Sequence, residues 1–226
     1  MSATAFFEQL RWLGIKHWKR KSDLTTIGST SRLKFSQTFL MNYFSGLLIG
    51  SCFGVFVLYM AVEAVRVRKG EKRRFEVRFW LFAVFVVLAL VFRGWFAERS
   101  GSVVWAQTMT TNILADLATV LGLILVIQSR RALGQNWSSE VVIQEKHELI
   151  EKGPYAYIRH PLYSGLILML MGVALYYGRT AWIIIFVCSF FGFYFKSRME
   201  ERLLTKTFPA YSEYKRRTKA LIPLIW

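Results

Sequence analysis

The chain has 226 residues, of which 54% are hydrophobic and 19% charged, and its formal net charge is +16. The apolar residues come in long blocks and the charges stand between the blocks, an alternation that a lipid solvent demands. A nucleic-acid-binding protein is disfavoured, because the basic residues flank the apolar blocks, where they set membrane topology and meet anionic lipid headgroups.

Residues 1–40 form a basic N-terminal arm. Phe6, Leu10 and Leu13 recur at nearly helical spacing and are followed by a run of lysines and arginines. This pattern is typical of an amphipathic helix that lies on the lipid headgroups. A disordered basic tail explains the same composition equally well, so both interpretations stay open.

The next part of the chain, 41–128, contains three apolar blocks, at 41–62, 79–97 and 109–128. Each block is long enough, as a helix, to cross the hydrocarbon core of a bilayer. We therefore predict three transmembrane helices in this part.

Asn112 and Asp116 lie one helical turn apart within the third block. An acidic residue inside a membrane span is a candidate functional site by default. A buried hydrogen bond to a neighbouring helix explains the pair as well, and this is the interpretation that we favour.

The last part, 129–226, contains two shorter apolar blocks, 162–177 and 181–195, joined by a turn around Gly178. Two short blocks joined so closely predict a helical hairpin whose helices continue beyond the hydrocarbon. Together with the three preceding blocks, they predict an all-α polytopic membrane protein with about five transmembrane helices.

Lysine and arginine are concentrated in the connectors 63–78 and 129–161 and in the C-terminal tail, which five spans place on one side of the membrane. The positive-inside rule assigns that side to the cytoplasm. We therefore predict a protein of the inner (cytoplasmic) membrane of a prokaryote, with anionic lipids as partners at its cytoplasmic face.

The hairpin brings two polar segments together. Reflected through the turn at Gly178, His160 on the incoming helix corresponds to position 197 on the returning helix. The segments 153–163 and 196–202 are therefore expected to face each other at the cytoplasmic mouth of the hairpin.

Arg198, Glu200 and Glu201 follow directly after the apolar part of the returning helix, and the same reflection places the two glutamates level with Tyr155 to Tyr157. Adjacent carboxylates cannot share one face of a helix, so one can point to a pocket while the other meets a basic partner or solvent. A solvated helix end with ordinary ion pairs remains the alternative.

Pro161 has the fixed backbone angle that suits the first turn of a helix, and His160 before it is biased to extended geometry. The helix that enters the membrane is therefore expected to begin here, with free N–H groups and a partial positive charge that suit a carboxylate ligand. Gly153 and Gly165 on either side permit close approach of the backbone.

A longer series of residues continues this pattern to the end of the chain. In order, the series is Leu133-Gly134, Trp137-Ser138, His147-Glu148-Leu149-Ile150, Gly153-Pro154-Tyr155, Arg159-His160-Pro161, Tyr163, Gly165, Glu200-Glu201, Phe208, Tyr211, Tyr214 and Pro223. This series resembles the isoprenylcysteine carboxyl methyltransferase family and its phospholipid methyltransferase relatives. Each piece alone is weak evidence for the family. Their order and spacing behind three apolar blocks are specific to it.

Members of this family are integral membrane enzymes that use S-adenosyl-L-methionine, and the resemblance implies the same activity and cofactor for a catalytic region at 129–226. It implies cofactor binding by His147, Leu149, Ile150, Gly153, Pro154, Tyr155, His160, Tyr163, Glu200 and Glu201. One of the two glutamates would meet the cofactor ammonium, and Arg198 would lie near the methyl acceptor. Arg198 and Glu201 are thus the candidate catalytic residues, and no metal site is expected.

The implied methyl acceptor is lipid-like or isoprenoid-linked and reaches the site from the bilayer. A carboxylate acceptor is already ionised and needs no base, whereas an amine acceptor would first lose a proton to Glu201 or His160. Two other classes stay open. One is an NADPH-dependent reductase of the sterol reductase type, which resembles this family in its C-terminal region; the other is a non-catalytic, lipid-binding helix bundle.

Overall fold

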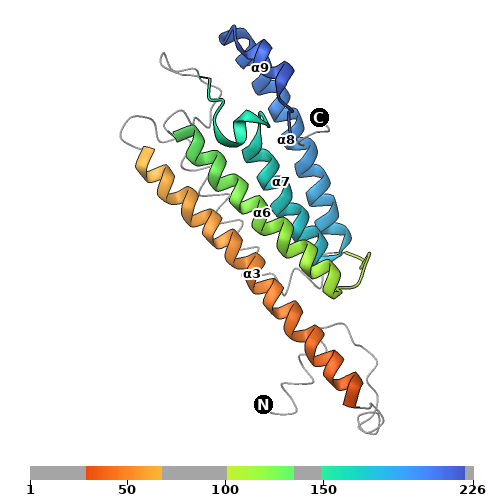
Figure 1. Cartoon of the computed structure of the whole chain (residues 1–226). Coiled ribbons are helices and arrows are strands. Elements are labelled where there is room, and N and C mark those ends of the chain that lie inside the picture. The colour runs from red at the N-terminus through yellow and green to blue at the C-terminus, as the bar shows by residue number, and fades with distance from the viewer. Residues whose placement is uncertain (1–28, 68–100, 135–148, 222–226) are drawn as a thin grey trace.

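The computed structural model describes residues 29–67, 101–134 and 149–221 (Figure 1). Its elements are, in order, α3 (Ser29–Val67), α6 (Met109–Leu133), the 3-10 helix η2 (Gly153–Ala156), α7 (Pro161–Tyr177), α8 (Thr180–Thr207) and α9 (Tyr211–Arg217). Within the described residues the only β-type pairings are two isolated bridges. The predicted all-α class is therefore confirmed.

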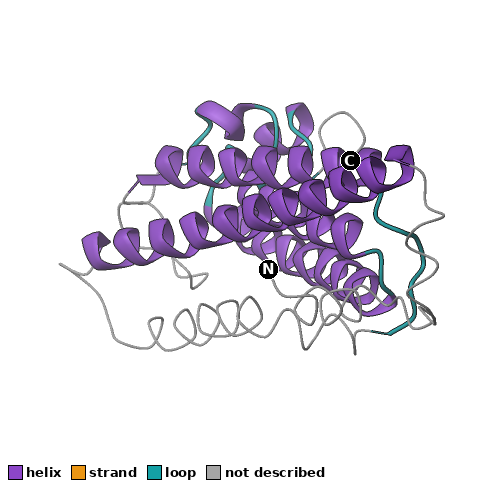
Figure 2. Ribbon diagram, turned by 90° about the horizontal axis from the view of Figure 1, so that it is seen from below, coloured by secondary structure: helices purple, strands orange, loops and turns teal. Residues whose placement is uncertain are grey.

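The long helices pack lengthwise into one bundle, with α6 between α3 and α7 and with α8 against α7 (Figures 1 and 2). Helices α3 and α6 run in the same direction. At one end of the bundle Asn112, near the start of α6, donates from its amide to Asn42 Oδ1 on α3. At the other end Arg130 Nη2 lies 3.4 Å from Glu63 Oε2. The span predicted at 79–97, like most of the basic arm, lies outside the described residues.

Glycines set the close packing of α6 against α7. A Cβ atom added to Gly165 would lie 2.7 Å from the carbonyl oxygen of Gly122, and one added to Gly122 would lie 2.6 Å from that of Gly165. The two helices therefore touch backbone to backbone, with the fully buried Val126 and Met169 beside the contact. Such contacts between small residues are typical of membrane helices, and they confirm the expected close approach at Gly165.

The predicted hairpin is confirmed. Gly178 ends α7 in a left-handed conformation with φ +57°, its N–H bonds to the carbonyl oxygen of Ala174, and α8 begins at Thr180. A left-handed cap of this kind is the usual place for glycine. Helix α8 runs 28 residues to Thr207, well beyond the apolar block that predicted it.

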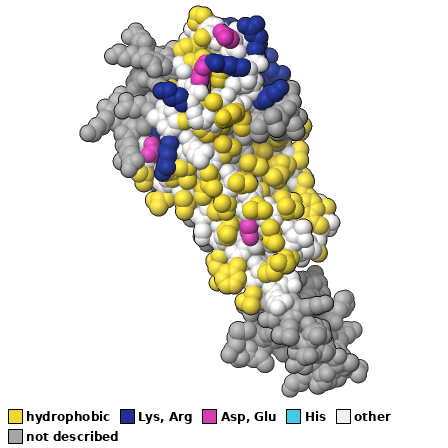
Figure 3. All heavy atoms as spheres, in the orientation of Figure 1, with side chains coloured by type: hydrophobic (Ala, Val, Ile, Leu, Met, Phe, Trp, Pro, Cys, Tyr) yellow, Lys and Arg dark blue, Asp and Glu magenta, His cyan; other side chains and the backbone are white. Residues whose placement is uncertain are grey.

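Three described helices are long and apolar enough to cross a membrane: Gln37–Glu63 within α3, Met109–Leu133 and Thr180–Thr207. Helix α7, at 17 residues, is a shorter apolar helix. Hydrophobic side chains cover the middle of the visible face, while lysines and arginines gather at the end that carries α9 (Figure 3). This distribution is what a bundle that spans a bilayer requires.

Asn112 and Asp116 face α3. The Asn112 amide donates to Asn42 Oδ1 at 2.6 Å, and Ser45 Oγ donates to Asp116 Oδ2 at 2.8 Å. The favoured interpretation, a hydrogen bond between helices, is therefore confirmed for both residues.

Candidate active site

The chain before α7 forms a compact loop at the basic end of the bundle. It starts with η2, whose first residue Gly153 has φ +61°, a conformation that favours glycine. The buried Tyr155 lies in η2, and its carbonyl oxygen accepts a hydrogen bond from the Tyr214 hydroxyl at 2.7 Å. Pro161 is the first residue of α7, as predicted. The loop thus continues directly into α7 and is bonded to α9 through Tyr214.

The segment after α9 runs alongside this loop. The backbone N–H groups of Arg159 and His160 donate to the carbonyl oxygens of Lys219 and Ala220 at 2.8 and 3.0 Å, and the Lys219 N–H donates to Tyr157 O at 3.2 Å. We call residues 218–221 the C-terminal strap. It pairs with residues 157–160, which directly precede the first residue of α7.

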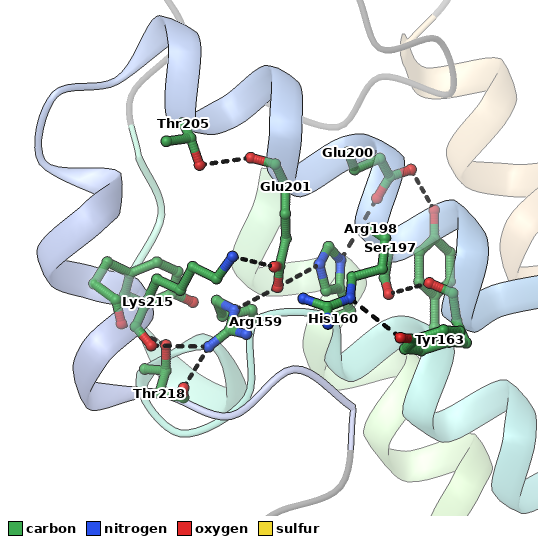
Figure 4. A network of polar contacts seen from close by, with 12 residues as sticks. Arg159, His160, Tyr163, Ser197, Arg198, Glu200, Glu201, Thr205, Lys215 and Thr218 are labelled. Atoms are coloured by element: carbon green, nitrogen blue, oxygen red, sulfur yellow. Dashed lines mark hydrogen bonds and ion pairs between the residues drawn. The ribbon is translucent and has the colours of Figure 1, made fainter. Parts of the chain in front are cut away.

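The two polar segments meet, as predicted. The Tyr163 hydroxyl donates to Glu200 Oε1 at 2.6 Å, and the His160 ring lies between the two glutamates (Figure 4). His160 Nδ1 is 3.5 Å from Glu200 Oε2, and His160 Nε2 is 3.6 Å from Glu201 Oε1. These contacts join the start of α7 to the polar end of α8.

The predicted level of the two glutamates is wrong. They contact Arg159, His160 and Tyr163 rather than lying level with Tyr155 to Tyr157. The reflection assumed helical rise on both sides of the hairpin. The chain before Pro161 is a loop, so it turns back and does not continue the helix.

Glu201 is buried, with 2% of its side chain exposed, and both of its carboxylate oxygens face cations. Arg159 Nε donates to Oε1 at 2.6 Å, and Lys215 Nζ lies 3.0 Å from Oε2. Arg159 Nη1 also donates to the carbonyl oxygens of Lys215, at 3.1 Å, and Thr218. A single arginine thus joins the loop, α8, α9 and the C-terminal strap.

Glu200 has a different environment, although it is the next residue. Its side chain is 21% exposed, and its contacts are the neutral Tyr163 hydroxyl and the His160 ring. Successive residues of a helix point about 100° apart, which is why one carboxylate enters the α9 contact and the other faces α7.

Tyrosines line the buried side of the site. Burial, followed by the nearby charges of Glu201 and Glu200, raises the pKa of Tyr211 above its ordinary range, and burial raises that of Tyr214 to about 12. Both phenols therefore stay protonated at neutral pH. The Tyr211 hydroxyl is buried and has no hydrogen-bond partner among the described residues. The Tyr163 ring stacks on Phe193, with ring centroids 5.2 Å apart.

The other predicted site residues are placed as follows. Arg198 is exposed, with its guanidinium 5.6 Å from the centre of the Tyr194 ring and its Nε 3.4 Å from that hydroxyl. Leu149 and Ile150 are half-buried, and Pro154 lies in η2. His147 lies outside the described residues.

Sequence reasoning assigned no role to Arg159, Lys215 or Thr218. Arg159 stands in the Arg-His-Pro series that carries the resemblance, so its position was visible although its partner was not. Lys215 is one of many basic residues in the tail, and no spacing distinguishes it from its neighbours.

The fold matches a solved structure, that of the eukaryotic intramembrane Ras methyltransferase ICMT (isoprenylcysteine carboxyl methyltransferase). The TM-score is 0.56 at 20% identity, over 77% of this chain and 64% of that one. The apolar helices and this shared fold define the class: an integral membrane protein of polytopic helical fold.

The family model for phospholipid methyltransferases matches residues 110–211, which include the hairpin and the site residues from Arg159 to Glu201. Together with the shared fold, this match supports the resemblance to isoprenylcysteine carboxyl and phospholipid methyltransferases that the sequence predicts.

Two curated relatives are bacterial. The chain is 29% identical over 153 residues to the cobalt-zinc-cadmium resistance protein CzcN of Cupriavidus metallidurans. The aligned residues cover 66% of this chain and 64% of that protein. It is 30% identical over 152 residues to the nickel-cobalt-cadmium resistance protein NccN of Alcaligenes xylosoxydans xylosoxydans, covering 66% of this chain and 65% of that one. The chain thus spans a little under two thirds of the length of these relatives.

Proposed function

We propose that this chain is an integral membrane methyltransferase that transfers the methyl group of S-adenosyl-L-methionine to a lipid-like or isoprenoid-linked acceptor. The observation that carries the proposal is the convergence of His160, Tyr163, Glu200 and Glu201 at the basic end of an apolar bundle. The family supports a methyltransferase, and the chemistry of these side chains supports this cofactor.

The cofactor carries a sulfonium, an ammonium and a carboxylate. The Glu200–Glu201 pair offers anionic groups for the ammonium, and the first turn of α7 offers free N–H groups and a partial positive charge for the carboxylate. Gly153, Pro154 and Tyr155, with Leu149, Ile150 and His147 before them, would form the remaining wall. When bound, the cofactor supplies the methyl group, and the chain holds it in line with the acceptor and excludes water.

The acceptor is proposed to arrive from the bilayer along α8. That helix exposes Phe191, Phe195 and Met199 on the way to the site, so a hydrocarbon chain can stay in contact with apolar surface. Arg198 stands at the end of this path and is the candidate contact for an anionic acceptor group. A carboxylate acceptor, already ionised, would need no base.

The basic end of the bundle is proposed to face the cytoplasm, where it would meet anionic lipids. The inner membrane of a bacterium fits the two curated relatives. Both relatives are named as metal-resistance proteins. We therefore also propose that methylation of a membrane component by this chain contributes to resistance against divalent metals.

The test is calorimetric titration of the detergent-purified chain with S-adenosyl-L-methionine and, separately, with NADPH. Binding of the first supports the methyltransferase and turns the question to the acceptor, which incorporation of labelled methyl groups into membrane extracts would then identify. Binding of NADPH alone would favour the reductase. Binding of neither by a folded protein would favour a non-catalytic lipid-binding bundle.

A further inference from the structure

A buried ion pair joins α3 to the end of α6 that lies beside the candidate site. Arg130 on α6 has 1% of its side chain exposed, and its Nη2 lies 3.4 Å from Oε2 of Glu63 on α3. Its Nη1 donates at 2.7 Å to the carbonyl oxygen of Gly134, the residue that caps the end of α6. A buried ion pair contributes little net stability compared with apolar side chains of the same size. The pair is therefore a candidate for a role other than stability.

The last turn of α6 supports one wall of the site. Helix η2 packs on it, and a Cβ atom added to Gly153 at the start of η2 would lie 3.7 Å from the Ala132 Cβ. Helix η2 also carries the buried Tyr155. Burial raises the pKa of the Tyr155 phenol, and Arg130 acts in the opposite direction, as a cation within electrostatic reach does. The wall at 153–155 therefore rests on the turn of α6 that Arg130 fixes.

We propose that Arg130 is a positioning residue for methyl transfer, and that its ion pair with Glu63 makes α3 a working part of the site. This inference rests on the proposed function. Helix α3 lies outside residues 110–211, the part of the chain that the phospholipid methyltransferase model matches. The pair thus gives a role in the site to a helix that this match does not include.

The shape of the guanidinium explains how one side chain can act on two neighbours. Its donors form a rigid planar fork, so the contact of Nη2 with Glu63 also sets the direction of Nη1 towards the Gly134 carbonyl oxygen. A shift of this last turn would move η2, and with it the loop that leads to His160. A displacement of about 1 Å at a reacting group is enough to slow a reaction strongly.

Glu63→Gln tests this coupling, because it removes the charge that faces Arg130 and keeps the size of the side chain. Calorimetric titration of the full chain in detergent should show binding of S-adenosyl-L-methionine weakened about fivefold or more. The matched control is Ser45→Ala, which removes a hydrogen bond between the same two helices towards the other end of the bundle, from Ser45 to Asp116. That variant should keep the affinity within about twofold, whatever its loss of stability.

A double variant separates position from stability. Glu63→Leu with Arg130→Met replaces the pair by apolar side chains of similar size, so no charge is left buried alone and the chain should unfold no more easily than the unsubstituted one. The Gly134 carbonyl oxygen still loses its donor, so the affinity should again fall about fivefold or more. Amide hydrogen exchange of residues 153–160, which needs no ligand, should become faster in the double variant and stay unchanged in Ser45→Ala.

A normal affinity in the folded double variant would overturn the inference. Equal losses of affinity in Glu63→Gln and Ser45→Ala would do the same, and so would equally faster exchange at residues 153–160 in Ser45→Ala. Each of these results would leave the proposed function intact. If the unsubstituted chain does not bind S-adenosyl-L-methionine, the proposed function fails, and the role of Arg130 in methyl transfer fails with it.

Discussion

Replacing Arg159 by glutamine tests whether the charge network holds the site together. The substitution removes the Nε donor that lies 2.6 Å from Glu201 Oε1 and the Nη1 donor shared by the carbonyl oxygens of Lys215 and Thr218. Both charged side chains are buried, Arg159 at 7% and Glu201 at 2% exposure. The variant therefore leaves a buried carboxylate with one remaining cation, Lys215.

The expected cost is about 3 kcal/mol in the free energy of unfolding. Removing one partner of a buried ion pair typically costs about 3–5 kcal/mol, because the other charge stays buried. Two carbonyl oxygens also lose their donor, at about 1 kcal/mol each. Lys215 offsets part of this sum, because it still faces Glu201 Oε2 at 3.0 Å.

Denaturant unfolding of the detergent-purified protein, followed by tryptophan fluorescence, measures this cost. The matched control is Arg217→Gln, which removes an exposed ion pair between α9 and Glu151, just before η2. That pair should contribute less than about 1 kcal/mol. The double variant Arg159→Gln with Glu201→Gln should lose less than the sum of the two single variants, because neither charge is left alone. Equal losses in Arg159→Gln and Arg217→Gln would refute the reasoning.

Three further outcomes are expected. Gly165→Leu should lower the thermal unfolding midpoint strongly, because its Cβ would meet the Gly122 carbonyl oxygen, whereas Gly192→Leu, with nothing within 4 Å, should not. Asp116→Asn should leave the affinity for S-adenosyl-L-methionine within about twofold, since Asp116 bonds to Ser45 on α3; a tenfold loss would place it in the site. Because the folded-state pKa of Tyr214 is raised to about 12, its contribution to stability should be complete below about pH 10 and be lost towards pH 12. Tyr214→Phe should make this loss of stability smaller, with the remainder due to other buried tyrosines such as Tyr211, and an unchanged pH profile in that variant would contradict the assignment.

The helices of this protein could be predicted because lipid imposes a long apolar block on each span. The blocks at 41–62, 109–128, 162–177 and 181–195 all fall within observed helices, although α3 and α8 extend well beyond them. Apolar composition marks the part of a helix that lies in hydrocarbon, and it does not mark where a polar continuation ends. The polar end of α8 was expected only because the hairpin geometry required it.

The site could be predicted to the level of facing segments, but not of partners. Reflection through Gly178 predicted that the segments 153–163 and 196–202 face each other, and the contacts of Tyr163 and His160 with the two glutamates confirm this, although the level predicted for the glutamates was wrong. The partner of Glu201 could not be predicted, because Arg159 is directed by backbone pairing between residues 157–160 and the C-terminal strap. That pairing joins two short non-helical segments that lie far apart in sequence, and no periodic pattern marks such segments.

Membrane packing and the polar site are coupled through the first turn of α7. On one side of that turn, Gly165 touches the backbone of Gly122 on α6, so α7 cannot slide or rotate without a collision. On the other side, the Ser164 hydroxyl donates to the carbonyl oxygen of Leu221 in the C-terminal strap. His160 directly precedes this turn and Tyr163 lies in it. Their positions against Glu200 are therefore set by helix packing within the bilayer and by the strap outside it, so that the site stays assembled only while both contacts hold.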